Sequence, residues 1–306
     1  MKIMFMGTPD FAVSSLKAIS DIHDVVCVVT KPDMPFGRGH KSMPPPIKVW
    51  ALEKGLDVCQ PESLKNGEFQ ETLEKYGPDI IVVVAYGKIL PRYVLEFPKY
   101  GCINVHASLL PQYRGAAPIQ RAIINGDTIS GVCTMKMVEE LDAGDILDVV
   151  ETKIYPNETS GELFNRLSDL GAQLLLKTLE GNFSGTAQNV DKVTFAPPLT
   201  KEEAKINWKD SAENIVNLIR GTNPSPIAHT KTEDGRAFKI YRVVLADDRG
   251  VHDKCGQVLG LNKEQGLLVT AGVGTLCIEE FQESGGKRMA PEAYLCGKNP
   301  INSFVN

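Results

Sequence analysis

Short apolar runs alternate with segments of helical periodicity through the first two thirds of the chain, and this alternation limits the folds that are possible. The runs are almost continuous in valine and isoleucine, most clearly at 80–84, as is typical of strands buried on both faces of a parallel sheet. The pattern predicts a Rossmann-like α/β fold, an open and mostly parallel sheet with crossover helices. We expect strands at 2–6, 25–30, 79–85, 101–106 and 131–137, and helices at 9–19 (with Thr8 as N-cap), 64–76, 118–125 and 160–180.

A polar stretch at 189–207 that contains Pro197 and Pro198 separates this region from a different pattern. Such a stretch is typical of a linker. After a helix at 212–220, for which Asp210 and Glu213 indicate a capping box, we expect short strands at 228–232, 237–245, 255–261, 266–270 and 275–281. Five short strands and one helix predict a small, OB-like β-barrel. We therefore expect domains at 1–188 and 208–306, joined by the linker.

Composition narrows the class of protein. The chain has 306 residues, 42% of them hydrophobic, as in ordinary globular proteins. No apolar run approaches the roughly 18 residues of a membrane span, and the N-terminus enters a turn before a signal-peptide core could form. The seven cysteines are scattered, so neither a disulfide framework nor a zinc knuckle is visible. We expect a cytoplasmic protein without a structural metal.

The charge balance bears on nucleic-acid binding. The chain carries 33 basic and 38 acidic side chains, for a formal net charge of -5, so it lacks the strongly basic field of a general nucleic-acid binder. One local basic segment stands out at residues 31–48. Against the single acid Asp33 it holds Lys31, Arg38, His40, Lys41 and Lys48. It is either a solvated surface loop or a local contact for a polyanion.

Two polar side chains share a face of the predicted strand 101–106. Because side chains alternate along a strand, Ile103 and Val105 face one side, and Asn104 and His106 face the other. Both lie near the carboxyl end of the strand, where open α/β sheets bind ligands. A lone histidine here would be read as a hydrogen-bonded core residue. A buried amide and imidazole without a task are costly, however, so we consider them candidate catalytic groups.

An acidic loop at 139–145 follows the strand predicted at 131–137. Asp142 or a neighbouring carboxylate there could orient His106 and stabilise its protonated form. The alternative is that these residues form a solvated acidic loop without a catalytic role. The residue types and their spacing favour neither a transition-metal site nor a calcium loop.

The turn Gly7-Thr8-Pro9-Asp10 lies between the first strand and the first helix. It lacks the glycine series of a dinucleotide-binding loop, and Asp10 occupies a position where a phosphate would favour positive potential. A Rossmann dehydrogenase is therefore disfavoured. We expect this turn to line the ligand crevice instead.

Several segments together resemble the methionyl-tRNA formyltransferase family, and the likeness extends over nearly the whole chain. Folate-dependent formyltransferases in general share the elements that contain Asn104, His106, Ser108-Leu109-Leu110-Pro111 and Asp142. The Gly37-Arg38-Gly39 loop, the linker and the barrel resemble the tRNA enzymes in particular. The segments that carry the resemblance are Gly7-Thr8-Pro9-Asp10-Phe11-Ala12, 104–111, 114–119, 141–145 and 198–204.

The resemblance implies transfer of a formyl group from 10-formyltetrahydrofolate, a co-substrate, to the amino group of initiator methionyl-tRNA, without a metal. Asn104, His106 and Asp142 would be catalytic. The folate side would be formed by Ser108, Leu109, Leu110, Pro111, Val84, Ala85 and Tyr86. The tRNA would be contacted by Arg38, Lys41, Phe11, Lys201 and Lys205. We expect a monomer.

Two alternatives stay open on the sequence. A formyltransferase acting on a small amine, such as a purine precursor or a nucleotide sugar, would share the catalytic set but would have no use for the Arg38 loop and the barrel. A non-catalytic tRNA-binding or regulatory protein would retain only an inactive crevice, which the intact Asn104, His106 and Asp142 argue against. The chain also has Gln112-Tyr113 after Pro111, where the family pattern has a basic residue and a tryptophan.

Overall fold

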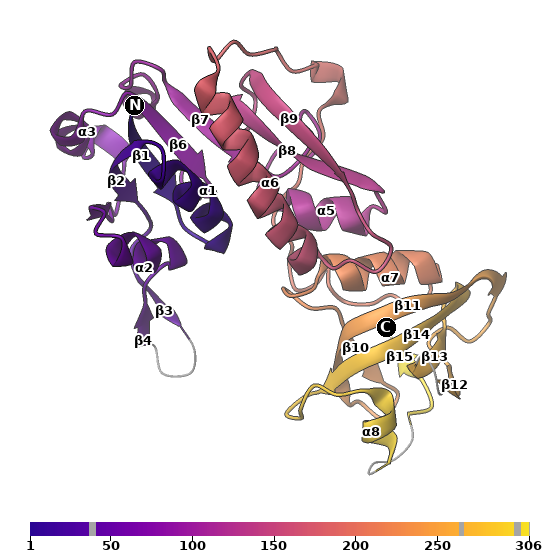
Figure 1. Cartoon of the computed structure of the whole chain (residues 1–306). Helices are drawn as coiled ribbons and strands as arrows, with labels where there is room; N and C mark the ends of the chain where they lie inside the picture. Colours follow the sequence, from indigo (N-terminus) through magenta and orange to yellow (C-terminus); the bar gives the residue numbers. More distant parts are fainter. Residues whose placement is uncertain (37–40, 263–265, 297–300, 306) are drawn as a thin grey trace. The chain divides into compact units, whose positions relative to one another are not determined.

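The computed structural model describes residues 1–36, 41–262, 266–296 and 301–305, and the chain divides into two compact units (Figure 1). The first unit contains Met1–Pro118, Ser130–Thr152 and Phe164–Ala196. The second contains Ile119–Ile129, Lys153–Leu163 and Pro197–Asn306. Within the described ranges, no helix is both long and apolar enough to cross a membrane.

A seven-stranded sheet forms the centre of the first unit. Across the sheet, the strands are β5 (Val58–Cys59), β2 (Asp24–Val29), β1 (Lys2–Gly7), β6 (Ile80–Val84), β7 (Cys102–His106), β8 (Ile129–Lys136) and β9 (Ile146–Lys153). The strands from β5 to β7 run parallel to one another, and all of them except β5 are strands that the sequence predicts. β8 runs antiparallel to β7, so the sheet is mixed but mostly parallel. The predicted α/β fold is confirmed.

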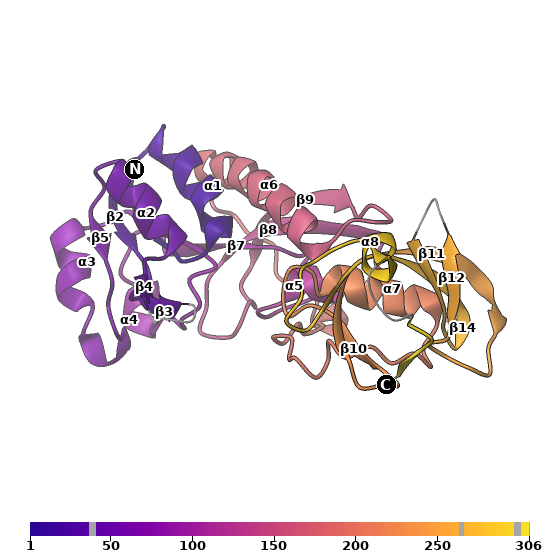
Figure 2. The ribbon, with the colours of Figure 1, turned by 90° about the horizontal axis from the view of Figure 1, so that it is seen from below.

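Two helices cover one face of this sheet. Figures 1 and 2 show α1 (Asp10–Ser20) beside α6 (Ser160–Glu180). The ring of Phe11 packs edge-on against that of Phe164 at 5.1 Å between centroids, and Ser168 Oγ donates to the Phe11 carbonyl. In the middle of α6, a Cβ on Gly171 would lie only 3.0 Å from Val105 Cγ1. Glycine here allows the helix to approach β7 closely.

The opposite face packs against two shorter helices, α3 (Gln70–Tyr76) and α4 (Arg92–Leu95). The predicted helix 64–76 is wrong in its first turn, because a 3-10 turn at Lys65–Gly67 replaces it. Asn66 and Gly67 both have positive φ there, 54° and 78°, which no α-helix accepts. The cluster on this face contains Met4, Met6, Cys27, Val29, Leu64, Phe69, Leu73, Ile81, Val83, Tyr86, Leu90, Val94 and Cys102.

The first helix begins differently from the sequence prediction. Pro9, not Thr8, is the N-cap of α1, and no side chain caps this helix. Thr8 Oγ1 instead donates to the Tyr86 carbonyl at 3.1 Å. The hydroxyl thus joins the turn after β1 to the turn after β6, which is the carboxyl edge of the sheet.

The remaining elements up to residue 196 are short. Their bounds are β3 (Met34–Phe36), β4 (Lys41–Met43), α2 (Pro46–Glu53), α5 (Pro118–Ile124) and the 3-10 turn at Val190–Lys192. The sequence did not predict β3, β4, β5, β9 or α2. β3 and β4 pair antiparallel, with Phe36 opposite Lys41. They form the two sides of the predicted basic loop, whose residues 37–40, Arg38 among them, lie outside the described part.

The second unit is built around a six-stranded sheet. Its order is β12 (Val258–Asn262), β13 (Gly266–Thr270), β14 (Val273–Glu283), β11 (Ala237–Val251), β10 (His229–Thr232) and β15 (Phe304–Val305). The first and last strands meet, because Phe304 N donates to Gly256 O and Val258 N donates to Asn302 O. These bonds draw the two edges of the antiparallel sheet together in the manner of a barrel, as the five predicted strands suggested.

Helix α7 (Ala212–Gly221) packs its apolar residues into this barrel. Ile215 and Ile219 lie in the same core as Trp208, whose ring stacks on Phe304 at 5.4 Å. The predicted capping box is wrong: Ser211, not Asp210, is the N-cap, and its side chain accepts from Asn214 N. The helix therefore begins one residue later than the box would require.

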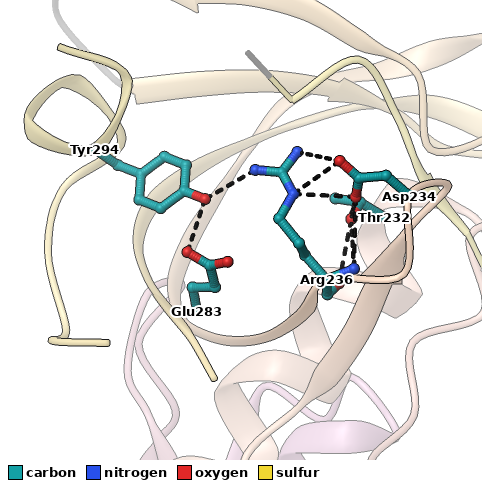
Figure 3. Close-up of polar contacts among 5 residues, drawn as sticks. All are labelled: Thr232, Asp234, Arg236, Glu283 and Tyr294. Atoms are coloured by element: carbon teal, nitrogen blue, oxygen red, sulfur yellow. Dashed lines mark hydrogen bonds and ion pairs between the residues drawn. The ribbon is translucent and has the colours of Figure 1, made fainter. Parts of the chain in front are cut away.

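A polar network ties α8 (Pro291–Leu295) to the barrel (Figure 3). Arg236 forms a salt bridge with Asp234 at 2.8 Å and donates to Tyr294 Oη at 2.9 Å, and Tyr294 in turn donates to Glu283. The Arg236 guanidinium, followed by the Thr232 hydroxyl, lowers the pKa of Asp234 to about 2. The network holds the helix over the aromatic cluster of Phe238, Phe281 and Tyr294.

Candidate active site

The candidate catalytic pair lies on β7, between β6 and β8. Asn104 is opposite Val83 on one neighbour and Met135 on the other, and His106 is opposite Cys133. The closeness of Val105 Cγ1 to Gly171 shows that the Val105 side chain faces α6. Because side chains alternate, Asn104 and His106 extend from the other face of the sheet. His106 is the last residue of the strand.

The imidazole of His106 is 6% exposed and is held from both ring nitrogens. Nε2 lies 3.0 Å from the carbonyl oxygen of Tyr113, and Nδ1 lies 3.7 Å from Asp142 Oδ2. A carbonyl can only accept, so Nε2 carries a proton in this arrangement. Nδ1 is then the nitrogen that faces the carboxylate.

Asp142 is brought to His106 by the loop after β8. Its side chain is 11% exposed, and Oδ2 accepts a 2.8 Å hydrogen bond from Gly115 N. The same oxygen therefore contacts the loop after β7 and faces the imidazole. At 3.7 Å the carboxylate and Nδ1 are within range of an ion pair but too far apart for a direct hydrogen bond.

Three non-glycine residues near this site have left-handed backbones. They are Ala85 (φ 49°), Tyr113 (φ 61°) and Asp142 (φ 49°), in the loops that follow β6, β7 and β8. Each such residue costs on the order of 1–2 kcal/mol, so contacts around it must hold it. Tyr113 N, for example, donates to Thr194 Oγ1 at 2.9 Å.

The expected folate-side residues divide into buried and accessible groups. Val84 and Tyr86 are 0% and 1% exposed, so they lie beneath the surface that a ligand could contact. Burial also raises the pKa of Tyr86 to about 12, which keeps the phenol neutral. Ala85 is exposed.

The segment 108–111 forms a tight turn after β7. Ser108 is buried and its hydroxyl donates to Gln112 O at 2.7 Å. Leu110 packs on Cys133 and Met135, and the peptide bond to Pro111 is cis. Leu109 and Pro111 are partly exposed. They are therefore the side chains of this turn that could contact a ligand.

The residues expected to contact tRNA differ in how far they are exposed. The Phe11 side chain is 4% exposed, so in this structure it packs α1 against α6 and offers little surface to a partner. Lys201 and Lys205 are exposed in the second unit. Lys41 begins β4, although its side chain lies outside the described residues, as does all of Arg38.

Two residues that support the acidic loop were not predicted as functional. Arg114 is 5% exposed and contacts Glu140, at 3.1 Å, and Gln188. Gln188 donates to the carbonyls of Asp142 and Gly144. Arg114 lay within a segment of the family resemblance, whereas nothing in the polar stretch around Gln188 marked it. Across the described part, no group of three or more His, Cys, Asp or Glu side chains could hold a metal ion.

Two family models and several curated relatives match the chain. Residues 1–179 match the family model of formyl transferase, and residues 198–299 match that of the formyl transferase C-terminal domain. Methionyl-tRNA formyltransferases from Acetivibrio thermocellus, Lachnospira eligens and Alkaliphilus oremlandii are 43%, 47% and 47% identical to the chain, and each comparison covers 97% of this chain and 96% of the relative.

Solved structures show the same fold at lower identity. An N-formyltransferase from Helicobacter canadensis, in complex with folinic acid and dTDP-3-aminofucose, has a TM-score of 0.66 at 20% identity, covering 91% of this chain and 98% of that one. HypX from Aquifex aeolicus, in complex with tetrahydrofolic acid, has a TM-score of 0.63 at 17% identity; the match covers 100% of this chain but only 51% of HypX. For a methionyl-tRNA formyltransferase from Clostridium thermocellum, the values are 0.56 and 18%, with 80% and 93% covered. Since both family models and near-full-length relatives match, the chain belongs to the methionyl-tRNA formyltransferase family.

Proposed function

We propose that this formyltransferase uses Asn104, His106 and Asp142 to transfer the formyl group of 10-formyltetrahydrofolate to the amino group of initiator methionyl-tRNA. The observation that carries the assignment is the fixed imidazole of His106. It is buried, its Nε2 is anchored by Tyr113 O, and its Nδ1 faces the Asp142 carboxylate. Asn104 extends from the same face of β7.

The reaction requires attack of a neutral amine on the formyl carbon. A new N–C bond forms, the carbonyl oxygen becomes an oxyanion in the tetrahedral intermediate, and the bond from carbon to N10 of the folate then breaks. The Asn104 side chain carries an amide N–H that can donate to the oxyanion. A donor placed where charge develops lowers the barrier more than it stabilises the substrate.

Proton movement falls to the His106 and Asp142 pair. The amine must lose a proton as the new bond forms, and the departing folate nitrogen must gain one. Nδ1 of His106 is the ring nitrogen that faces Asp142, so a proton held there is stabilised by the carboxylate. In its protonated form, the imidazole adds positive charge beside the oxyanion. Asp142 accepts the amine proton directly or through water, and the same proton passes to N10 as the bond from carbon to N10 breaks.

The folate donor is proposed to bind along the turns after β6 and β7. These are the segments Val84–Tyr86 and Ser108–Pro111 discussed above, and they lie at the carboxyl ends of adjacent parallel strands. That edge is where ligands bind in open α/β sheets. Support comes from the two structural neighbours solved with tetrahydrofolic acid or folinic acid. Their fold, shared with this chain, supports the proposal that a folate binds here.

The tRNA is proposed to contact basic side chains outside this turn region. Lys201 and Lys205 are exposed, and Arg38 and Lys41 belong to the basic loop. We retain 1–188 as the catalytic domain, 189–207 as the linker and 208–306 as the tRNA-binding domain. The family model boundaries, 179 and 198, fall near these limits. We further propose that the enzyme acts as a cytoplasmic monomer.

One assay tests the proposal. Purified protein is incubated with 10-formyltetrahydrofolate and charged initiator methionyl-tRNA, and the amino acid released from the tRNA is analysed for N-formylmethionine. A parallel reaction replaces the tRNA by a dTDP-amino sugar. Formylation of methionine alone is the expected result. Formylation of only the sugar, or of neither acceptor, would contradict the proposed function.

A further inference from the structure

The segment that follows α6 runs beside the loop after β7 and is bonded to it through the backbone. Arg114 N donates to Thr194 O at 2.9 Å, and Ala196 N donates to Arg114 O at 2.7 Å. The Thr194 hydroxyl also accepts from Tyr113 N. This segment therefore supports the residue whose carbonyl anchors His106. The mechanism above gives it no role of its own.

Gln188 extends the same support to the acidic loop. Its amide nitrogen donates to the carbonyl oxygens of Asp142 and Gly144, both at 2.8 Å. Its oxygen accepts from Nε and Nη2 of Arg114 at 3.1 and 2.9 Å. The partners fix the orientation of the amide, because a guanidinium only donates and a carbonyl only accepts. One side chain thus joins the loops after β7 and β8.

The arrangement places a buried cation beneath the catalytic carboxylate loop. Arg114 is 5% exposed, and its other terminal nitrogen lies 3.1 Å from Glu140, whose side chain is 76% exposed. A glutamine suits the position between Arg114 and the two carbonyls because it offers one acceptor and two donors on one planar group. A carboxylate would repel the carbonyl oxygens, and an apolar residue would leave the guanidinium with fewer partners.

The acidic loop packs closely against the end of β8. A Cβ on Gly144 would lie 1.9 Å from Lys136 O, so this part of the loop is pressed against the end of β8. Asp142 has a left-handed backbone, φ 49°, which is unfavourable unless contacts maintain it. The carbonyl that Gln188 holds belongs to this strained residue.

We infer that Gln188 is a positioning residue for catalysis, which acts by holding the Asp142 backbone so that the carboxylate faces His106. The inference rests on the proposed catalytic role of Asp142. Gln188 does not touch the reacting groups. Its loss should therefore lower kcat and leave the binding of both substrates almost unchanged.

The principal test compares Gln188→Leu and Gln188→Glu with the parent enzyme. Leucine keeps the approximate size and removes all hydrogen bonding. Glutamate keeps the acceptor for Arg114 but loses both donors, and its charge pairs with the guanidinium, so this variant is expected to fold. We expect kcat to fall about 10- to 100-fold in each variant, the usual effect of misplacing a catalytic group. KM for tRNA and for folate should change less than about threefold.

Asn189→Leu is the matched control, because Asn189 is an exposed amide next to Gln188 that bonds within its own turn, to Asp191 N. It should retain the parental kcat. Parental kcat in Gln188→Glu, or a change confined to KM, would overturn the inference.

A double-mutant cycle with Asp142→Asn separates positioning from general damage. If Gln188 acts through the carboxylate, Gln188→Leu should add less than about threefold to the loss in Asp142→Asn. An equal loss of kcat in both backgrounds would show a merely structural role and overturn the inference. Parental activity of Asp142→Asn itself would contradict the proposed function, whereas an impaired Asp142→Asn with a fully active Gln188→Leu would overturn only the role of Gln188.

Discussion

Asp142 and His106 face each other at 3.7 Å, from Oδ2 to Nδ1. His106 is the last residue of β7, and Asp142 lies in the loop that follows β8, the antiparallel neighbour of β7. The same Oδ2 accepts from Gly115 N at 2.8 Å. The carboxylate is therefore held by the backbone, and its distance from the imidazole does not depend on a hydrogen bond between the two side chains.

Replacing Asn104, His106 or Asp142 by Ala should lower kcat by about two to four orders of magnitude. This is the usual effect of removing an oxyanion donor or an acid-base group. Affinity for tRNA should change little. Because the three groups act on one transition state, the His106→Ala and Asp142→Ala losses should not multiply in the double variant. Steady-state kinetics with charged tRNA checks this, and near-parental turnover in all three single variants would remove the assignment.

Catalysis is expected to proceed without a metal ion. The chemistry assigned to Asn104, His106 and Asp142 needs no Lewis acid. Formylation of pre-charged tRNA should therefore survive a chelator, provided that monovalent salt keeps the tRNA folded. The control is addition of excess magnesium, which should have no further effect. Loss of activity that only zinc restores would contradict the expectation.

The sheet and the face shared by Asn104 and His106 were predictable because they depend on local periodicity. Apolar runs marked β1, β2 and β6, most continuously the Val/Ile run of β6. Alternation along β7 placed the two polar residues on one face. Strand direction was less accessible. An apolar run carries no information about its own polarity, so β8 was not recognised as antiparallel. β9 was missed because polar residues interrupt its apolar ones and none of its residues is buried.

Contacts made through the tertiary path of the chain could not be predicted from spacing. Thr8 resembles a helix cap, but its hydroxyl bonds Tyr86 O on another turn. Gln188 is the residue directly before the stretch interpreted as linker, and its role depends on Asp142 and Arg114, which are distant in sequence. The resemblance to a family identified Asp142, but it did not indicate that Gln188 supports Asp142. Such positioning contacts require the fold.

The ion pair between Glu203 and Arg121 predicts a pH-dependent contribution to stability. Their closest atoms lie 2.8 Å apart, and Arg121, followed by the backbone N–H of Thr200, lowers the pKa of Glu203 to about 2 from 4.5. A depressed folded-state pKa stabilises the fold above the unfolded value. The contribution is therefore complete above about pH 4.5 and is lost as the pH falls toward 2.

Glu203→Gln should accordingly lower the unfolding temperature at pH 7 and flatten its decline between pH 4.5 and 2. The pair is partly exposed, with side-chain exposures of 19% and 41%, so the effect should stay below about 1 kcal/mol, or roughly 1–3 °C. Thermal unfolding followed by circular dichroism measures it. Glu202→Gln removes the same charge from the exposed neighbouring residue and serves as the control. Identical pH profiles for the two variants would show that the Arg121 pair does not contribute.

A protein with a net negative charge must bind a polyanion such as tRNA through local basic segments. In the basic segment 31–48, the single acid Asp33 is already paired, because Lys48 Nζ lies 2.8 Å from it and Gln60 also donates to it. Lys48 is therefore neutralised at the base of the segment. The charges that remain for tRNA include those of Arg38 and Lys41. Arg38→Ala and Lys41→Ala should lower kcat/KM for charged tRNA. They should also make the dependence of kcat/KM on salt shallower, because tRNA binding with one phosphate contact fewer releases fewer counterions. Folate binding should be unchanged, and Lys17→Ala, an exposed lysine on α1, should leave both quantities as in the parent. If the Arg38 and Lys41 variants keep the parental kcat/KM and salt slope, the segment is a surface loop and the tRNA is held elsewhere.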